Sequence, residues 1–229
     1  MFHVPRQTSH TLFTADLSDY ELIGSGAVRS CYREPGGQTC VKFYTCQDKL
    51  HPKRKQSTRL RLLLTRHLYW FNINMQEWRY YQRLKKRLPA EVLKAFPEQM
   101  DPLYSPRYGW GLRETLLLNA DGSPTRLVEK ELKVMKSHAE AQELFERVSD
   151  FLSQMIRYAV PVYDPRNILV QWVSPARYEL RMVDFEPRAK AFVPGLSYLA
   201  WFVRHRVATR SQRYLSRLQK DMTEAYKNV

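Results

Sequence analysis

Several features that would assign the chain to a particular class of protein are missing from its sequence. No stretch of about 18 apolar residues occurs, so we expect no membrane-spanning helix. The N-terminal stretch MFHVPRQTSHTLFTADLSDY has no continuous apolar run of the kind that a secretory signal requires. Internal repeats and low-complexity tracts are also missing. We therefore expect a cytoplasmic chain, and its 229 residues suffice for one domain or two small lobes.

Cysteine is scarce, with only Cys31, Cys40 and Cys46 in the whole chain. The number is odd, and the spacing is not that of paired metal ligands. We expect reduced thiols in a cytosolic protein and no zinc site.

Acidic residues are few relative to basic ones, 23 against 37, which leaves a formal net charge of +14. The excess is concentrated in residues 49–66, which contain seven Lys or Arg and no acid, and in the tail from Trp201. Such a charge favours an anionic partner: a nucleotide, a nucleic acid, a phospholipid or an acidic protein. The alternative is that these residues form solvated helix faces. No RNA-binding module signature is present, which disfavours nucleic acid.

The first part of the chain has the pattern of strands. Residues 1–18 are polar and mixed, and we expect an N-terminal arm. The stretches YELIGSG, VRSCYREPGG and QTCVKFYT that follow read as three strands with tight connections. They predict an antiparallel meander.

A long helix should follow the meander. Apolar residues recur at steps of three and four, which predicts a helix from about Ser57 or Thr65 to Leu88, where Pro89 ends it. A kink is expected near Asn72 and Asn74. The stretch AEVLKAFPEQM can add a short helix.

The second part of the chain mixes strands and helices. Strands are predicted in 106–119 and 125–132 on either side of an Asp-Gly turn, followed by a helix over 137–158. ILVQWV and YELRMVDF predict a β-hairpin through Ser174-Pro175-Ala176, and a basic helical tail follows. The element order predicts an α+β chain with an arm (1–18), an N-lobe (19–122) and a C-lobe (123–229).

Two glycines stand between the first two predicted strands. Gly24 and Gly26, around Ser25, would let backbone N–H groups approach a phosphate without interference from Cβ atoms. A plain hairpin turn explains them equally well.

A lysine and a glutamate follow the two glycines along the chain. Lys42 lies on the third strand between Val41 and Phe43, where an inward ammonium needs an anionic partner. Glu77, on the long helix, is the candidate carboxylate. The functional interpretation is that this pair directs Lys42 at a nucleotide; the alternative is a structural salt bridge.

Two oxygen-bearing side chains lie beside the predicted hairpin. Asn167 precedes its first strand and Asp184 follows its second, and such oxygens suit Mg²⁺ together with nucleotide phosphates. The alternative is that Asn167 caps a turn and Asp184 is an exposed loop acid.

This ordered series resembles the protein-kinase-like fold, here with a small antiparallel-sheet N-lobe and a short, mostly helical C-lobe. GSG is similar to the Gly-rich loop, VKFY to the strand of the ATP-binding lysine, and DFE to the metal-binding Asp-Phe-Gly. The stretches GSGAVRSCY, CVKFY, EWRYYQRL and YDPRNILV resemble the YrbL-like bacterial family, named for the PhoP regulatory network. The resemblance covers roughly residues 22–186 and implies binding of ATP and Mg²⁺.

The chain departs from the kinase pattern at three positions. Arg29 replaces the third glycine of the loop, where it can itself touch phosphate. Glu186 replaces the glycine of Asp-Phe-Gly. Val162 stands where the catalytic Asp is expected. Asp164 lies three residues before Asn167, where typical kinases hold a Lys, and would stand in as an unconventional base.

The sequence thus predicts a kinase-like protein that transfers the γ-phosphoryl group of ATP. Lys42, held by Glu77, would bind the α- and β-phosphates, and Asn167 and Asp184 would hold Mg²⁺. The alternative is a pseudokinase scaffold, because Val162 can neither accept a proton nor orient a hydroxyl. The short chain after Asp184 leaves little for a peptide platform, so a small molecule, a lipid-linked sugar or a dedicated protein are all plausible acceptors.

Overall fold

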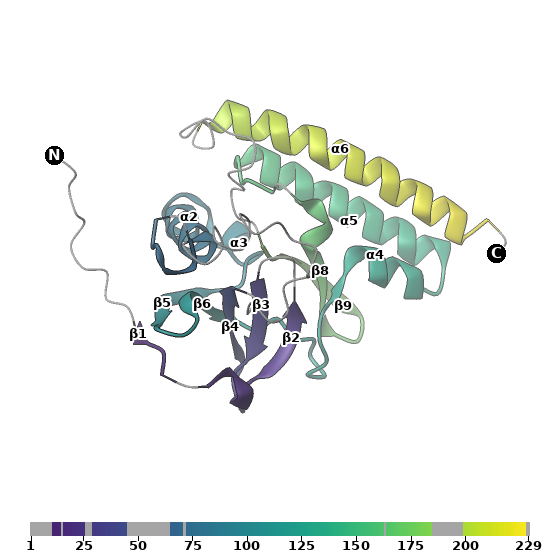
Figure 1. Cartoon of the computed structure of the whole chain (residues 1–229). Coiled ribbons are helices and arrows are strands. Elements are labelled where there is room, and N and C mark those ends of the chain that lie inside the picture. The colour runs from purple at the N-terminus through teal and green to yellow at the C-terminus, as the bar shows by residue number, and fades with distance from the viewer. Residues whose placement is uncertain are drawn as a thin grey trace, which may run out of the picture. The chain divides into compact units, whose positions relative to one another are not determined.

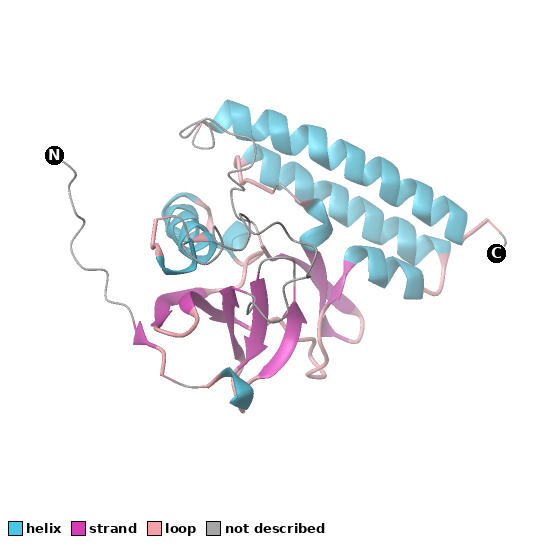
Figure 2. Cartoon of the chain, viewed as in Figure 1, coloured by secondary structure: helices cyan, strands magenta, loops and turns pink. Residues whose placement is uncertain are grey.

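The computed structural model of the chain describes residues 11–14, 16–25, 29–44, 65–70, 72–162, 164–184 and 199–227 (Figure 1). The chain divides into two compact units. Unit 1 comprises Met1–Gln82 and Glu98–Leu116, and unit 2 comprises Arg83–Pro97 and Leu117–Val229. Strands and helices are both abundant (Figure 2), so the α+β class is confirmed. The kinase-like arrangement and the lobe bounds at residues 122 and 123 stay predictions.

Unit 1 is built on a six-stranded sheet with the order β1-β5-β6-β4-β3-β2. The strands are β1 Thr11–Leu12, β2 Glu21–Ser25, β3 Arg29–Arg33, β4 Thr39–Tyr44, β5 Gln99–Ser105 and β6 Gly109–Thr115. All neighbouring strands are antiparallel except β1 and β5. The predicted meander of three strands is confirmed as β2, β3 and β4.

Strand β5 was not expected from the sequence. The helical pattern after Pro89 ends early, in the short helix α3 at Ala90–Leu93, and the chain is extended from Gln99. Pro102 lies inside the strand, where a proline normally argues against sheet. A shift of register between Gln99 and Pro102 accommodates it against β6.

The long helix α2 is shorter than predicted, because it begins at Ile73 and ends at Arg87. Asn72 explains the start: its Oδ1 accepts from the backbone N–H of Asn74 at 2.9 Å and of Met75 at 3.3 Å. This is an N-cap, which satisfies donors that a new helix leaves unpaired. Residues 65–67 form a separate helical turn, and residues 57–64 lie outside the described part of the chain.

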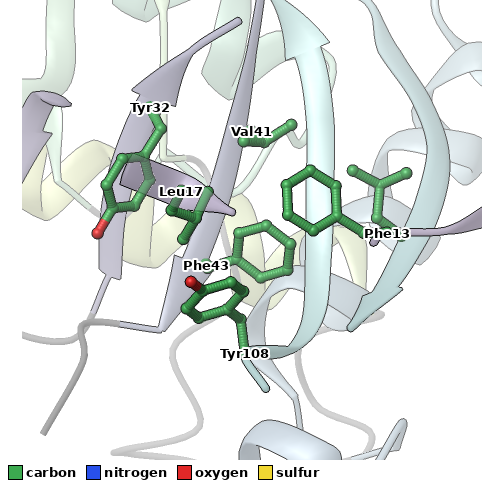
Figure 3. Packing of buried hydrophobic residues seen from close by; sticks show 7 residues of the cluster. Phe13, Leu17, Tyr32, Val41, Phe43 and Tyr108 are labelled. Atoms are coloured by element: carbon green, nitrogen blue, oxygen red, sulfur yellow. The ribbon is translucent and has the colours of Figure 1, made fainter. Parts of the chain in front are cut away.

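One face of the sheet carries the aromatic core of unit 1 (Figure 3). Its members are buried residues from strands β3, β4 and β5 and from segments outside the strands: Phe13, Leu17, Tyr32, Val41, Phe43, Leu103 and Tyr108. The rings of Phe13 and Phe43 lie 5.1 Å apart, centre to centre. Gly111 is required here, since a Cβ at this position would overlap the Phe43 ring.

The described part of the expected N-terminal arm packs into the aromatic core of unit 1. Phe13 and Leu17 are 4% and 7% exposed. The 3₁₀ helix η1, Leu17–Asp19, is capped by Asp16, whose carboxylate also accepts from the Tyr108 hydroxyl at 3.0 Å. Two isolated apolar residues in a polar stretch were too weak a pattern to predict this packing.

Unit 2 combines a three-stranded antiparallel sheet with helices. The sheet has the order β7-β8-β9, with β7 Arg126–Leu127, β8 Ile168–Ser174 and β9 Arg177–Met182, and the longer helices are α5 His138–Arg157 and α6 Ala200–Ala225. The predicted hairpin and the predicted helix over 137–158 are confirmed. Helix α6 packs along α5 (Figure 1). No helix in the described ranges is long and apolar enough to span a bilayer.

The predicted strand over 125–132 is mostly wrong. Only β7 is extended, and the short helix α4, Val128–Glu131, follows directly. The helical turn presents Glu131 to the indole of Trp172, which donates to its Oε1 at 2.8 Å. This tertiary contact is not visible in the local pattern, which alternates like a strand.

Candidate functional site

Lys42 is the central charged residue of unit 1. It lies on β4 between Val41 and Phe43, which belong to the aromatic core, and alternation along the strand places Lys42 on the opposite face. The residue is only 6% exposed. An ammonium group in this setting needs carboxylate or phosphate partners to offset its loss of hydration.

The carboxylates of Glu77 and Glu114 both lie near the Lys42 ammonium. The Nζ atom lies 3.6 Å from Oε1 of Glu77 and 2.7 Å from Oε1 of Glu114. Helix α2 brings Glu77, which is fully buried, and strand β6 brings Glu114, which is 3% exposed. Glu77, the carboxylate predicted from the sequence, lies near Lys42, and Glu114 is the closer of the two.

Glu114 could be found only once the strands were paired. Lys42 lies opposite Leu112, and Cys40 lies opposite Glu114, so Lys42 and Glu114 share one face of neighbouring strands. In the sequence Glu114 reads as an ordinary polar residue near a strand end. The pairing of β4 with β6 crosses a long stretch of chain, and no local pattern encodes it.

Arg29 is the closest cation to Glu77. Its Nη1 lies 2.5 Å from Oε2 of Glu77 and donates to Oδ1 of Asn74 at 3.2 Å. The amide of Gln99 donates to the other oxygen of Glu77 at 3.2 Å. Arg29, predicted from its place in the Gly-rich segment to touch phosphate, is thus held on the carboxylate of the predicted Lys42 partner.

Helix α2 is fixed to the sheet beside these charges by Asn74. Its side-chain amide donates to the carbonyl oxygen of Lys42 at 3.0 Å and to that of Trp110 at 2.9 Å. Asn74 and Glu77 are three residues apart and so lie on one face of the helix. The sheet and the helix start together set the position of the Glu77 carboxylate.

Arg29, Lys42, Glu77 and Glu114 form what we call the buried ion cluster. It contains two cations and two carboxylates, so its formal charges cancel. Buried ions are retained in a fold when they are paired in this way, and removal of one partner leaves the other uncompensated. The cluster can hold Lys42 in a defined place, and it already supplies the anions that Lys42 requires.

The glycine segment is described only in part. Gly24 and Ser25 end β2, where Ser25 lies opposite Ser30 and their hydroxyl oxygens are 3.0 Å apart. A Cβ at Gly24 would meet no atom within 4 Å, so the backbone there is open to approach. Gly26 lies outside the described residues. A phosphate-binding loop and a plain turn both remain compatible with this geometry.

In unit 2 the two predicted metal ligands lie at the same end of the hairpin. Asn167 directly precedes β8, and Asp184 follows β9 after Val183. Ile168 lies opposite Met182, and the N–H of Val183 donates to the carbonyl oxygen of Asn167 at 3.2 Å. Asp184 has φ of 53°, a left-handed conformation that is uncommon outside glycine and marks a constrained position.

Asp164, the predicted base, is bound to its neighbour. Its carboxylate caps the 3₁₀ helix η4, Pro165–Asn167, and accepts from Nε of Arg166 at 2.8 Å and from Nη2 at 2.7 Å. This two-point pairing raises the pKa of Arg166 further above its ordinary value. A carboxylate held by an arginine is a weak proton acceptor.

Val162 is fully buried, and its N–H donates to the carbonyl oxygen of Val160 at 2.8 Å. The position where a catalytic Asp is expected is therefore a packed apolar site. Val162 cannot accept a proton, and the carboxylate of Asp164 is paired with Arg166.

The thiols of unit 1 lie near the ion cluster. Cys31 lies opposite Lys42, and Cys31 and Cys40 are both free. A hydrogen bond with Cys31 and burial raise the pKa of the Cys40 thiol. Cys46 lies outside the described residues.

In the described part of the chain, no group of three or more His, Cys, Asp or Glu could hold a metal ion. A cation at Asn167 and Asp184 would therefore complete its shell with water or phosphate oxygens, as Mg²⁺ commonly does. Comparison with known proteins gives no relative: no protein-family model matches the chain, and no curated protein matches it.

Proposed function

We propose that the chain is a kinase-like protein that binds ATP and Mg²⁺ and transfers the γ-phosphoryl group to an acceptor. The observation that carries the proposal is the buried Lys42 on the third strand of a meander, with Glu77 reaching it from the helix that follows. In protein kinases a glycine-rich loop, a lysine on the third strand and a glutamate on the next helix serve the nucleotide phosphates.

Unit 1 contains side chains that suit phosphate, and unit 2 contains side chains that suit a metal ion. The cations Lys42 and Arg29 in unit 1 suit phosphate oxygens. In unit 2 the amide oxygen of Asn167 and the carboxylate of Asp184 are the hard oxygen donors that Mg²⁺ prefers. When bound, Mg²⁺ would offset the negative charge of the phosphates.

Phosphoryl transfer depends mainly on positioning and charge stabilisation. Lys42 would hold phosphate oxygens, and Glu77 would keep the lysine in place. The resemblance to the YrbL-like family supports the same activity. A small molecule, a lipid-linked sugar, a single dedicated protein and a general peptide are all compatible acceptors.

A pseudokinase that binds nucleotide without efficient transfer is the second candidate. The buried Val162 and the Asp164–Arg166 pair favour it, because neither group offers a free proton acceptor. General-base help is worth about 10²–10⁴-fold, so its loss slows a transfer reaction without abolishing it.

Mg²⁺-dependent ATP turnover tests the proposal. The wild type is expected to release ADP with Mg²⁺, and Lys42→Ala and Asp184→Ala are expected to lose this activity. Glu143→Gln, on the exposed face of α5, is the control. Turnover that persists in both alanine variants would rule out the proposed site, whereas nucleotide binding without any turnover would favour the pseudokinase.

A further inference from the structure

The buried ion cluster contains a second carboxylate, Glu114, beside the Lys42–Glu77 pair. We propose that Glu114 is an internal counter-ion that competes with a ligand phosphate for Lys42 and so lowers the affinity for nucleotide. This inference rests on the proposed function, because it concerns how the same lysine is made available.

Of the two carboxylates in the cluster, Glu114 lies closer to the Lys42 ammonium. Nζ lies 2.7 Å from Oε1 of Glu114, which is the length of a charge-assisted hydrogen bond. The oxygen of Glu77 lies 3.6 Å away, beyond the ordinary hydrogen-bond range. Lys42 is therefore directed at a carboxylate of its own sheet.

Glu77 is committed to other donors. Arg29 approaches one of its oxygens at 2.5 Å, and Gln99 donates to the other at 3.2 Å. These contacts do not involve the Lys42 ammonium, so they persist whichever anion the lysine binds. An exchange at Lys42 would replace Glu114 and leave the Arg29–Glu77 contact in place.

Charge balance favours this exchange. The four residues of the cluster are formally neutral together, with two cations and two carboxylates. A phosphate placed on Lys42 would add negative charge beside Glu114, and like charges in a poorly hydrated site repel strongly. Displacement of the Glu114 carboxylate relieves this repulsion, and its free-energy cost weakens the observed affinity.

Glu114→Gln separates this role from a purely structural one. The amide keeps the shape of the side chain and removes the competing charge. The affinity for ATP with Mg²⁺ is expected to rise about tenfold or more, the effect of one charge-assisted hydrogen bond that no longer has to be broken. The unliganded variant is expected to melt at a lower temperature, because Lys42 loses its closest anion.

A matched control exists on the other face of the same sheet. Glu34 lies 2.8 Å from Nη2 of Arg113, the residue next to Glu114. Glu34→Gln changes the net charge by the same amount without touching the cluster. Any gain in affinity that this variant shares reflects net charge and not competition at Lys42.

The experiment is isothermal titration of ATP with Mg²⁺, and of inorganic tripolyphosphate, into the full-length wild type, Glu114→Gln, Glu34→Gln and Lys42→Met. Tighter binding in Glu114→Gln alone supports the inference, as does binding by Glu114→Gln when the wild type shows none. Equal affinity in Glu114→Gln and the wild type, with binding lost in Lys42→Met, overturns the inference and leaves the proposed function intact.

If neither the wild type nor Glu114→Gln binds, the inference about Glu114 and the proposed function are both overturned. If Glu114→Gln does not fold, Glu114→Asp takes its place, because the shorter side chain withdraws the carboxylate from Lys42 and keeps the charge. It is also expected to bind more tightly than the wild type, and unchanged affinity would count against the inference.

Discussion

At the scale of single residues, the charges of unit 1 depend on one another. Glu77 contacts both cations of the cluster, since Arg29 lies 2.5 Å and Lys42 lies 3.6 Å from its oxygens. Loss of a fully buried carboxylate that is paired with two cations should therefore destabilise the protein far more than loss of one from a surface ion pair.

Glu77→Gln is accordingly expected to lower the free energy of unfolding by about 3–5 kcal/mol, the usual effect of breaking a buried ion pair. Urea denaturation followed by circular dichroism measures it. Glu143→Gln removes the exposed carboxylate that pairs with Arg147 on α5, and we expect a change below about 0.5 kcal/mol. Equal effects of the two substitutions would show that the cluster contributes nothing beyond a surface pair.

Glycines 111 and 24 differ in the space around them. A Cβ at Gly111 would overlap the ring of Phe43, which is fully buried in the aromatic core. Gly111→Ala is expected to destabilise the protein by about 1–3 kcal/mol through overpacking. Thermal unfolding monitored by fluorescence gives the value.

Gly24→Ala is the companion variant, since open space surrounds that position. Its melting temperature should stay near that of the wild type, while its affinity for ATP should fall if the glycine segment approaches phosphate. Strong destabilisation by Gly24→Ala, or none by Gly111→Ala, would contradict the packing described.

At the scale of elements, the turn before α2 is sensitive to acid. Burial, and then the charge of Arg66, lower the pKa of His67. The His67 ring accepts from Nε of Arg66 at 2.8 Å, and its other nitrogen lies 3.3 Å from the Tyr104 hydroxyl. The folded protein therefore favours the neutral imidazole.

The sign of the pH effect follows from proton linkage. The unfolded chain binds the His67 proton near pH 6.5, whereas the folded chain does so only at lower pH, so stability falls as pH decreases through this range. Between pH 7.5 and 5.5 the melting temperature of the wild type should fall more steeply than that of His67→Gln. His205→Gln, at an exposed position of α6, is the control. Identical slopes in the wild type and His67→Gln would contradict this prediction.

The elements also show what could be predicted from sequence and what could not. The meander, helix α5 and the hairpin of β8 and β9 have strong periodic patterns and local turn signals. Ser137 illustrates such a signal, since its hydroxyl caps α5 by accepting from the N–H of Glu140 at 3.2 Å. Strand β5 contains a proline and α4 follows an alternating pattern, so in both cases tertiary contacts overrode the local preference.

In the candidate site, too, contacts that depend on tertiary pairing could not be predicted from the sequence. Lys42 and Glu77 were predictable, because a lysine amid apolar strand residues implies an anionic partner on a neighbouring element. Glu114 was not, because its meeting with Lys42 depends on the pairing of β4 with β6. The engagement of Arg29 by Glu77 depends in the same way on the docking of α2 through Asn74.

At the scale of the whole molecule, the excess of positive charge is only partly placed. Residues 49–64 of the basic segment lie outside the described residues. Helix α6 carries exposed basic residues: Arg204, Arg213, Arg217 and Lys220. Contact with an anionic partner stays a prediction, and salt-dependent binding is its expected signature.

The central claim is that the chain binds ATP with Mg²⁺ through Lys42 and Asp184. A thermal-shift titration with ATP, with and without Mg²⁺, tests it most directly on the wild type, Lys42→Met and Asp184→Asn. The melting temperature of the wild type is expected to rise with ATP concentration, because a ligand that binds only the folded state stabilises it. The rise should need Mg²⁺, shrink in Asp184→Asn and vanish in Lys42→Met, each relative to its own unliganded protein. An equal rise in all three proteins, or no rise in the wild type and in Glu114→Gln, would contradict it.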